Sequence, residues 1–376
     1  MINSTLSTKG MVTAPHHLAA EAGRDVLREG GTAVEAMVAA AAAIAVVYPH
    51  MNAIGTDGFW LISGPGQSPV GIDACGPAAA SATPDWYHGL GYSSIPSRGP
   101  AAALTVPGTV AGWATALRQP GATSGRLPLS RLLEPAVALA NEGVPVTAHQ
   151  AVVTQEKLSE LRDIPGFADT FLAASGAAPQ WGTRVRQSQL AETIRRLGRA
   201  GLDDFYRGEI SEQIAKDLEA VGSPLQRQDL RDFRALEVEP LTLKTCGTQL
   251  FNMPPPTQGL ASLMILGIFD RLGVSHGEEF PHVHALVEST KQAFQVRDSH
   301  VTDPRFMTTP ASSFLAEDRL NAAAEEIDTS HAAPWPHCPK QGDTVWMGAI
   351  DHEGRSVSFI QSIYGEYGSC IVLPNT

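Results

Sequence analysis

The chain has 376 residues, enough to bury a hydrophobic core in one large domain or two. Hydrophobic residues make up 43% of it, and 27 basic against 39 acidic residues give a formal net charge of -12. Since an acidic surface repels phosphate backbones and no run of Lys and Arg interrupts it, nucleic acid is not expected as a partner.

The N-terminal segment and the cysteines predict a compartment. Residues 1–10 lack the charged start and apolar run of a secretory signal. The most apolar stretch, Ala33 to Val47, contains Glu35 and is followed by Tyr48-Pro49, so it is too short to span a bilayer. The cysteines are widely scattered, without metal-ligand spacing: Cys75, Cys246, Cys338 and Cys370. We expect free thiols in a cytoplasmic protein, and no membrane partner.

Two helices and a strand are predicted near the start. Apolar residues at helical spacing predict a helix over residues 15–29, which Gly30-Gly31 ends. A second, buried helix follows, and Thr32 with Glu35 three residues later forms a predicted capping box. Residues 51–58 then read as a loop entering a strand over residues 59–63. The glycines of this loop, taken alone, indicate turn geometry.

The middle of the chain is mostly helical by its pattern. The 3.6-residue period predicts helices over residues 129–142, 189–199, 209–220, 260–272 and 282–300. Short paired strands are predicted over residues 241–245 and 248–251, with Cys246-Gly247 at the turn. Residues 308–342 are rich in Ala, Ser, Pro and Glu, which predicts a surface segment. Strands near both ends with helices between them predict a mixed arrangement of helices and sheet.

A β-hairpin is predicted near the C-terminal end. Residues 345–350 and 356–363 are β-branched, apolar or small, and residues 351–355 supply turn chemistry. Thr344 stands immediately before the first of these strands. By local sequence alone two interpretations stay open: β-branching suits a sheet position, or the hydroxyl is a nucleophile that becomes an N-terminus.

Several common chemistries have no motif here. There is no GxxxxGK[ST] phosphate loop and no GxSxG elbow, and Gly89-Leu90-Gly91 lacks the third glycine of a dinucleotide fingerprint. His282 and His284 on one helix point to different faces. We therefore expect neither a metal site nor a cofactor.

Motifs in order along the chain carry a broader signal. They are Gly10-Met11-Val12, Gly30 to Ala36, Pro49-His50-Met51, Val106 to Gly112, Asp204 to Gly208, Pro254-Pro255-Pro256 and Ile360 to Gly365. This ordered set resembles the γ-glutamyltranspeptidase family. The resemblance implies an N-terminal nucleophile hydrolase of α+β class, a four-layer αββα sandwich, made as a precursor that cuts itself. It also implies a large-subunit region over residues 1–343 and the start of a small-subunit region over residues 344–376, so the sandwich is expected to be incomplete at the C-terminus.

By the same resemblance, Thr344 is the nucleophile and Asp343-Thr344 the bond that is cut. A threonine hydroxyl needs a base, and a freed α-amine on the same residue is one at short, fixed distance. Attack of the Thr344 hydroxyl on the Asp343 carbonyl would give an ester that water then hydrolyses. Ser362 takes the place of a family threonine whose hydroxyl contacts the nucleophile.

Two positions depart from the transpeptidase pattern. Tyr364 stands where transpeptidases carry an asparagine that helps hold the substrate. Asp73 stands where they place an arginine that grips the α-carboxylate of the γ-glutamyl group, and an aspartate would repel that carboxylate. The start at Thr344 and the strand through Ser362 look more like the oxamate amidohydrolase branch, while a cephalosporin-acylase-like member remains possible.

The expected function is an amidohydrolase that forms an acyl-enzyme on Thr344 with a small amide substrate bearing a carboxylate. The alternatives are true γ-glutamyl transfer with glutathione hydrolysis, and an inactive truncated family member. The family's oxyanion-hole glycines lie further along a longer small subunit, so the remainder of that subunit is an expected partner. Loss of an oxyanion hole costs about 3 kcal/mol of transition-state stabilisation.

Overall fold

The computed structural model describes residues 5–245, 247–335 and 344–376. The chain forms two compact units. The first takes the described parts of Met1–Ser68, Ile72–Leu236 and Gly342–Thr376, and the second takes those of Pro69–Gly71 and Glu237–Gln341. The two ends of the chain therefore belong to one unit. These compact units differ from the predicted large-subunit and small-subunit regions, which a covalent cut between residues 343 and 344 would separate. That subunit boundary stays a prediction.

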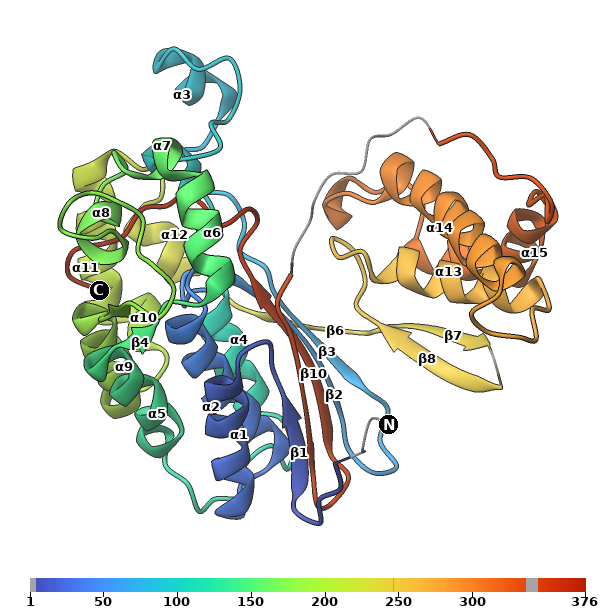
Figure 1. Ribbon diagram of the computed structural model, residues 1–376, viewed down its shortest axis with the longest axis horizontal. Coiled ribbons are helices and arrows are strands. Elements are labelled where there is room, and N and C mark those ends of the chain that lie inside the picture. The colour runs from blue at the N-terminus through green and yellow to red at the C-terminus, as the bar shows by residue number, and fades with distance from the viewer. Residues whose placement is uncertain (1–4, 246, 336–343) are drawn as a thin grey trace. The chain divides into compact units, whose positions relative to one another are not determined.

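The main sheet has the strand order β1-β9-β10-β2-β3-β6 (Figure 1). Its strands are β1 (Gly10–Thr13), β2 (Asp57–Ser63), β3 (Val70–Ala74), β6 (Leu236–Val238), β9 (Trp346–Asp351) and β10 (Ser356–Ser362). The pairs β1 with β9, β9 with β10 and β10 with β2 are antiparallel. The predicted hairpin is confirmed as β9 and β10. It lies inside the sheet, between two strands from the N-terminal part of the chain.

The longer helices of the first unit agree with the predicted ones, while several short helices had not been predicted. They are α1 (His17–Arg28), α2 (Ala33–Val47), α3 (Pro84–Gly89), α4 (Thr109–Leu117), α5 (Leu129–Glu142), α6 (Ala148–Glu156), α7 (Leu158–Leu161), α8 (Phe167–Phe171), α9 (Ser188–Ala200), α10 (Asp204–Arg207), α11 (Glu209–Val221) and α12 (Arg227–Asp232). A 3-10 turn, η1 (Pro100–Ala102), and a small sheet of β4 (Val144–Pro145) and β5 (Arg184–Val185) connect them. Every residue of α2 is buried, as its composition predicts, and the Thr32 capping box is confirmed.

One face of the main sheet is covered by helices and the other is half-exposed. Burial alternates along β2 and β10, as a strand with one buried face requires. On the covered face α2 packs against β9 and β10, and α4 packs against β2 (Figure 1). The Trp60 and Phe359 rings stack there with centroids 3.9 Å apart. This packing fixes which side chains of each strand stand on the half-exposed face.

Asp351 ties the β9–β10 turn to the start of α2. Its buried carboxylate accepts the Ala33 N–H at 3.0 Å, one of the donors that a helix N-terminus leaves without an intrahelical partner. It also accepts the Arg355 N–H at 3.0 Å and pairs with the Arg355 guanidinium at 2.9 Å. The turn that follows the Thr344 strand is therefore held by the core.

The second unit has its own hydrophobic core. Its elements are β7 (Leu241–Thr245), β8 (Thr248–Asn252), α13 (Gly259–Arg271), α14 (Phe280–His300), α15 (Glu317–Glu325) and the 3-10 turns η2 (Pro304–Phe306) and η3 (Ala311–Leu315). β7 and β8 pair in antiparallel fashion, which confirms the predicted strands. The prediction that residues 308–342 form a surface segment is wrong for its first half. Phe314, Leu315 and Leu320 are buried in this core, and their burial outweighs the polar composition around them.

No helix within residues 5–245, 247–335 and 344–376 is both long and apolar enough to cross a membrane. Cys75 and Cys370 are free thiols, while Cys246 and Cys338 lie outside the described residues. The cytoplasmic location stays a prediction.

Candidate active site

Thr344 lies two residues before β9, and its side chain is exposed. The register of β9 and β10 pairs Ile360 with Trp346. Beyond that pair the Gln361 N–H donates to the Val345 carbonyl at 3.1 Å, so the pairing continues. The same register, continued one pair beyond this bond, would set Ser362 opposite Thr344. Side chains of directly opposite residues point to the same face, with Cβ atoms about 4.5–5.5 Å apart.

Asp57 extends this arrangement across the next strand. The register of β10 and β2 pairs Ser362 with Asp57. Thr344, Ser362 and Asp57 therefore form one cross-strand row on the half-exposed face of the sheet, although they come from three separate segments. We call these three residues the nucleophile row.

A second carboxylate lies beside the Asp57 end of the row. Asp57 accepts the Gly76 N–H at 3.0 Å, and the Cys75 thiol donates to it at 3.6 Å. Asp73 accepts the Cys75 N–H at 2.8 Å. Burial raises the pKa of Asp57, and the Asp73 charge adds to this; burial also raises the pKa of Asp73. Among the described residues neither carboxylate has a salt-bridge partner.

The start of α4 holds the main chain at Asp57. The Gly108 and Thr109 N–H groups both donate to the Thr56 carbonyl at 2.9 Å. A Cβ on Gly108 would lie 1.9 Å from the Ala74 carbonyl oxygen, so only glycine allows this approach. The motif around Gly108 therefore positions Asp57.

Ser362 and Tyr364, both predicted site residues, lie in different surroundings. The Ser362 hydroxyl donates to the Met51 carbonyl at 3.4 Å and to the Ile363 carbonyl at 3.5 Å. Both distances are longer than a well-formed O–H···O bond, so this hydroxyl is free to bond a third group. Tyr364 is 98% exposed and makes little contact with the described chain. Ser362 thus lies at the end of β10 nearest to the Thr344 segment, while Tyr364 is exposed, and the roles of both residues stay predictions.

The residue before Ser362 is anchored in the core. The Gln361 side chain is fully buried and accepts the Trp113 indole N–H at 3.0 Å. Its amide donates to the Ala41 carbonyl at 3.1 Å and to the Asn52 side chain at 2.6 Å. These bonds fix the end of β10, and hence the place of the Ser362 hydroxyl.

His50, on the segment that follows α2, lies against His149 at the start of α6. His50 is fully buried, and its Nε2 is 3.0 Å from His149 Nδ1. Its Nδ1 has no hydrogen-bond partner within the part of the chain that the structure describes. Burial, with smaller effects from the positive charges of His149 and His16, lowers the pKa of His50 to about 3, while Glu366 acts in the opposite direction. His50 is therefore a neutral core residue immediately before Met51.

We expect the folded state to lose stability as the pH falls below 6.5. The unfolded chain protonates His50 near pH 6.5 and the folded chain only near pH 3, so protons favour the unfolded state between these values. His50 alone should lower the free energy of unfolding by about 1.4 kcal/mol from pH 7.5 to pH 5.5. Urea unfolding at both pH values would measure this. His16, whose pKa is lowered to about 4 mainly by burial, adds a change of the same sign.

The control for this pH effect is a His50→Gln variant. It should keep the His16 contribution and lose that of His50, so its pH dependence should be clearly smaller than that of the unsubstituted protein. Equal pH dependence in both proteins would contradict the assignment to His50.

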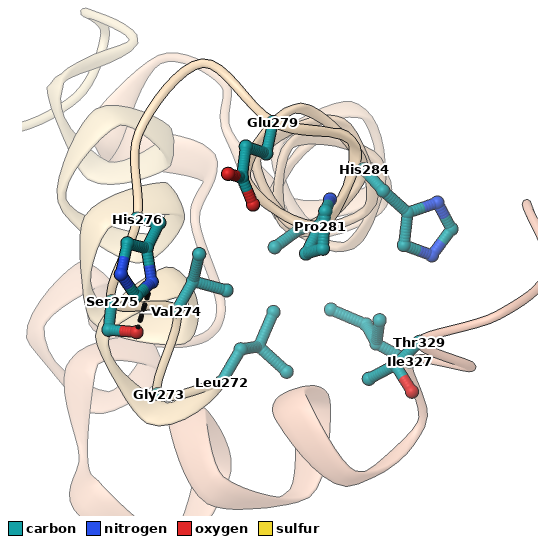
Figure 2. Close-up of a pocket in the computed structure, with 11 residues that line it drawn as sticks. Leu272, Gly273, Val274, Ser275, His276, Glu279, Pro281, His284, Ile327 and Thr329 are labelled. Atoms are coloured by element: carbon teal, nitrogen blue, oxygen red, sulfur yellow. Dashed lines mark hydrogen bonds between the residues drawn. The ribbon is translucent and has the colours of Figure 1, made fainter.

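A cavity of about 340 Å³ lies within the second unit. Its walls are largely apolar, with Leu272 and Ile327 among them, and His276 and Glu279 add polar groups. Figure 2 shows the imidazoles of His276 and His284 on opposite sides of it. His284 Nε2 is 2.7 Å from the Asp328 carbonyl oxygen. In the part of the chain that the structure describes, no group of three or more His, Cys, Asp or Glu side chains could hold a metal ion.

The nucleophile row supplies the Thr344 hydroxyl, the loosely held Ser362 hydroxyl and the Asp57 carboxylate. Sequence reasoning identified the first two by resemblance and missed Asp57, which it placed only in a loop entering a strand. The usable signal was a charged residue at the first position of an otherwise apolar strand. Asp343 lies outside the described residues.

Comparison with known proteins agrees with this chemistry. The sequence profile of the family described as Gamma-glutamyltranspeptidase matches residues 19–376. The chain is 52% identical over 377 residues to the oxamate amidohydrolase proenzyme of Klebsiella pneumoniae subsp. pneumoniae, covering 100% of this chain and 71% of that protein.

Two solved structures share the fold. The cephalosporin acylase of Bacillus halodurans is 33% identical with a TM-score of 0.89, over 100% of this chain and 69% of that one. The Helicobacter pylori gamma-glutamyltranspeptidase is 26% identical with a TM-score of 0.80, over 89% of this chain and 95% of that one. The predicted α+β fold of the N-terminal nucleophile hydrolase type is confirmed by these likenesses.

Proposed function

This chain belongs to the gamma-glutamyltranspeptidase family, a family of hydrolytic enzymes, and from that premise we propose that it is an amidohydrolase with Thr344 as nucleophile. The substrate is a small amide that carries a carboxylate. The observation that supports this most directly is the β9–β10 register, whose continuation past the Ile360–Trp346 pair would bring the loosely held Ser362 hydroxyl opposite Thr344. An exposed threonine beside a second hydroxyl is a suitable place for acyl transfer.

The first step is activation of the chain itself. The Thr344 hydroxyl attacks the Asp343 carbonyl carbon, the peptide C–N bond breaks, and the nitrogen becomes the α-amine of Thr344. Water then hydrolyses the ester that joins Asp343 to the Thr344 oxygen. Because the nitrogen is an amide before this cut, it acts as a base only afterwards. Activation and catalysis thus use the same two atoms of Thr344, its hydroxyl oxygen and its main-chain nitrogen.

Hydrolysis of the substrate follows in two steps. The Thr344 oxygen attacks the amide carbonyl and gives its proton to the α-amine, which passes a proton to the departing ammonia or amine. Water next attacks the acyl-enzyme ester, again losing its proton to the α-amine. The carboxylic acid leaves and the Thr344 hydroxyl is restored. The expected need for further small-subunit residues, as donors to the oxyanion, stays a prediction.

The carboxylates of Asp57, in the row, and of Asp73, beside it, disfavour a γ-glutamyl substrate. Asp57 and Asp73 lie without a cationic partner among the described residues, and Asp73 stands where the family's carboxylate-binding arginine is expected. A γ-glutamyl α-carboxylate would therefore lack the bidentate cationic partner that the family's arginine supplies. The relative named oxamate amidohydrolase, at 52% identity, supports oxamate as the first substrate to try.

A direct comparison of two substrates tests the proposed function. We expect ammonia release from oxamate to exceed p-nitroaniline release from γ-glutamyl-p-nitroanilide by about 100-fold or more in kcat/KM, since an unpaired ionic contact costs that much discrimination. Adding a dipeptide acceptor should not accelerate the second reaction. Faster γ-glutamyl turnover that a dipeptide stimulates would favour true transfer, the alternative function.

A further inference from the structure

We propose that Asp57 is a positioning residue for the Thr344 nucleophile, acting through the Ser362 hydroxyl that lies between them in the nucleophile row. The inference rests on the proposed function and adds to it a residue from β2, far from Thr344 in sequence. Neither the family motifs nor the sequence pattern pointed to it.

The geometry places the Asp57 charge beside Ser362. Asp57 and Ser362 are directly opposite in the β10–β2 register, and both stand on the half-exposed face. The Ser362 bonds to main-chain carbonyls, at 3.4 and 3.5 Å, are too long to hold its proton firmly. Among the described residues no hydrogen bond joins this hydroxyl to Asp57, but its rotation towards the neighbouring carboxylate would replace two long bonds by a stronger, charge-assisted one. The Ser362 lone pairs then face Thr344.

Asp57 itself is held firmly enough to do this. Its carboxylate accepts the Gly76 N–H at 3.0 Å, and the preceding carbonyl of Thr56 accepts two N–H groups from the start of α4. A Cβ on Gly76 would lie 1.6 Å from the Val106 carbonyl oxygen, so this glycine allows the close approach that the turn needs. Ser362 is fixed from the other side by Gln361, whose side-chain amide donates to the Ala41 carbonyl at 3.1 Å.

The charge has a second consequence for the base. A nearby carboxylate favours the protonated form of an amine, so an ionised Asp57 raises the pKa of the freed Thr344 α-amine. The other titratable groups that face Asp57 are Asp73 and Cys75 from the β3 side and the buried Tyr206 hydroxyl. Asp73 has the same sign of charge and adds to the effect. Burial raises the pKa of Tyr206, so its hydroxyl stays neutral.

The test is an Asp57→Asn variant, which keeps an oxygen for the Gly76 N–H and removes the charge. We expect kcat for amide hydrolysis to fall by about 10- to 100-fold with KM within about threefold, since only positioning of the nucleophile is lost. The acid limb of the pH profile of kcat should move down by about half a unit to one unit, because the amine loses its carboxylate neighbour. A merely structural role of Asp57 would not move that limb.

The matched control is Glu353→Gln. It removes one exposed carboxylate in the β9–β10 turn, at the end of that hairpin away from Ser362. Its kcat and acid limb should equal those of the unsubstituted protein. Asp57→Ser is the second variant, in case Asp57→Asn does not fold, and it should give the same shift. If a folded Asp57 variant keeps the control's kcat and acid limb, the inference is overturned. The proposed function is judged separately, by Thr344-dependent hydrolysis in the unsubstituted protein.

Discussion

Replacing Thr344 with alanine should yield a single uncut polypeptide that does not hydrolyse amides. The substitution removes the atom that attacks the Asp343 carbonyl, and without that cut no α-amine is released. Loss of a nucleophile that acts together with its base lowers kcat by at least about 10⁴-fold. Intact mass measurement and ammonia release from oxamate would measure the two effects on one preparation.

A Thr344→Ser variant separates chemistry from folding. Serine keeps the hydroxyl and the amine, so we expect slower cleavage and reduced but measurable hydrolysis. Thr13→Ala is the matched control, because Thr13 lies on the same sheet, exposed and paired with Gly348, away from the row. It should be cut and active. Cleavage at the same bond in Thr344→Ala would contradict the nucleophile assignment.

After the cut, the new N-terminal strand is expected to remain in place. β9 is hydrogen-bonded to β1 on one side and to β10 on the other, and β10 is in turn paired with β2. Met347 and Phe359 are fully buried in the core that the two parts share. The two polypeptides of the cut protein should therefore co-elute in gel filtration and separate only in denaturant.

Replacing Gln361 with leucine should destabilise the first unit by about 2–4 kcal/mol. Leucine has a similar volume but leaves the buried Trp113 indole N–H and the Asn52 side chain without their partner, and each unpaired buried group costs about 1–3 kcal/mol. Urea unfolding followed by tryptophan fluorescence would measure the loss. We also expect a lower kcat, since Ser362 follows Gln361 directly.

The control for this substitution is Gln249→Leu, on an exposed position of β8. Among the described residues its side chain bonds only the Thr242 hydroxyl, at the surface, so the substitution should change the free energy of unfolding by less than about 0.5 kcal/mol. An equal loss in both variants would show that the buried hydrogen bonds of Gln361 contribute nothing particular to stability.

Local sequence predicted local structure well. The period of α5 gave its observed bounds, Leu129–Glu142, because an amphipathic stripe and a glycine stop are both short-range signals. The Thr32 capping box was readable for the same reason. Residues 308–342 misled because composition was weighed above the few large apolar residues, and α15 owes its place to the burial of Leu320 against its neighbours.

The sequence by itself determined the family, most of the long helices and the hairpin after Thr344, and it proposed Thr344 and Ser362 as site residues. Only the tertiary structure decided that β9 and β10 lie inside the sheet and that Asp57 completes the row with them. Strand register depends on pairing between segments hundreds of residues apart, and no local period records which residue of one strand stands opposite which residue of another. The sequence could mark Asp57 as unusual, but only the folded chain shows that it stands opposite Ser362.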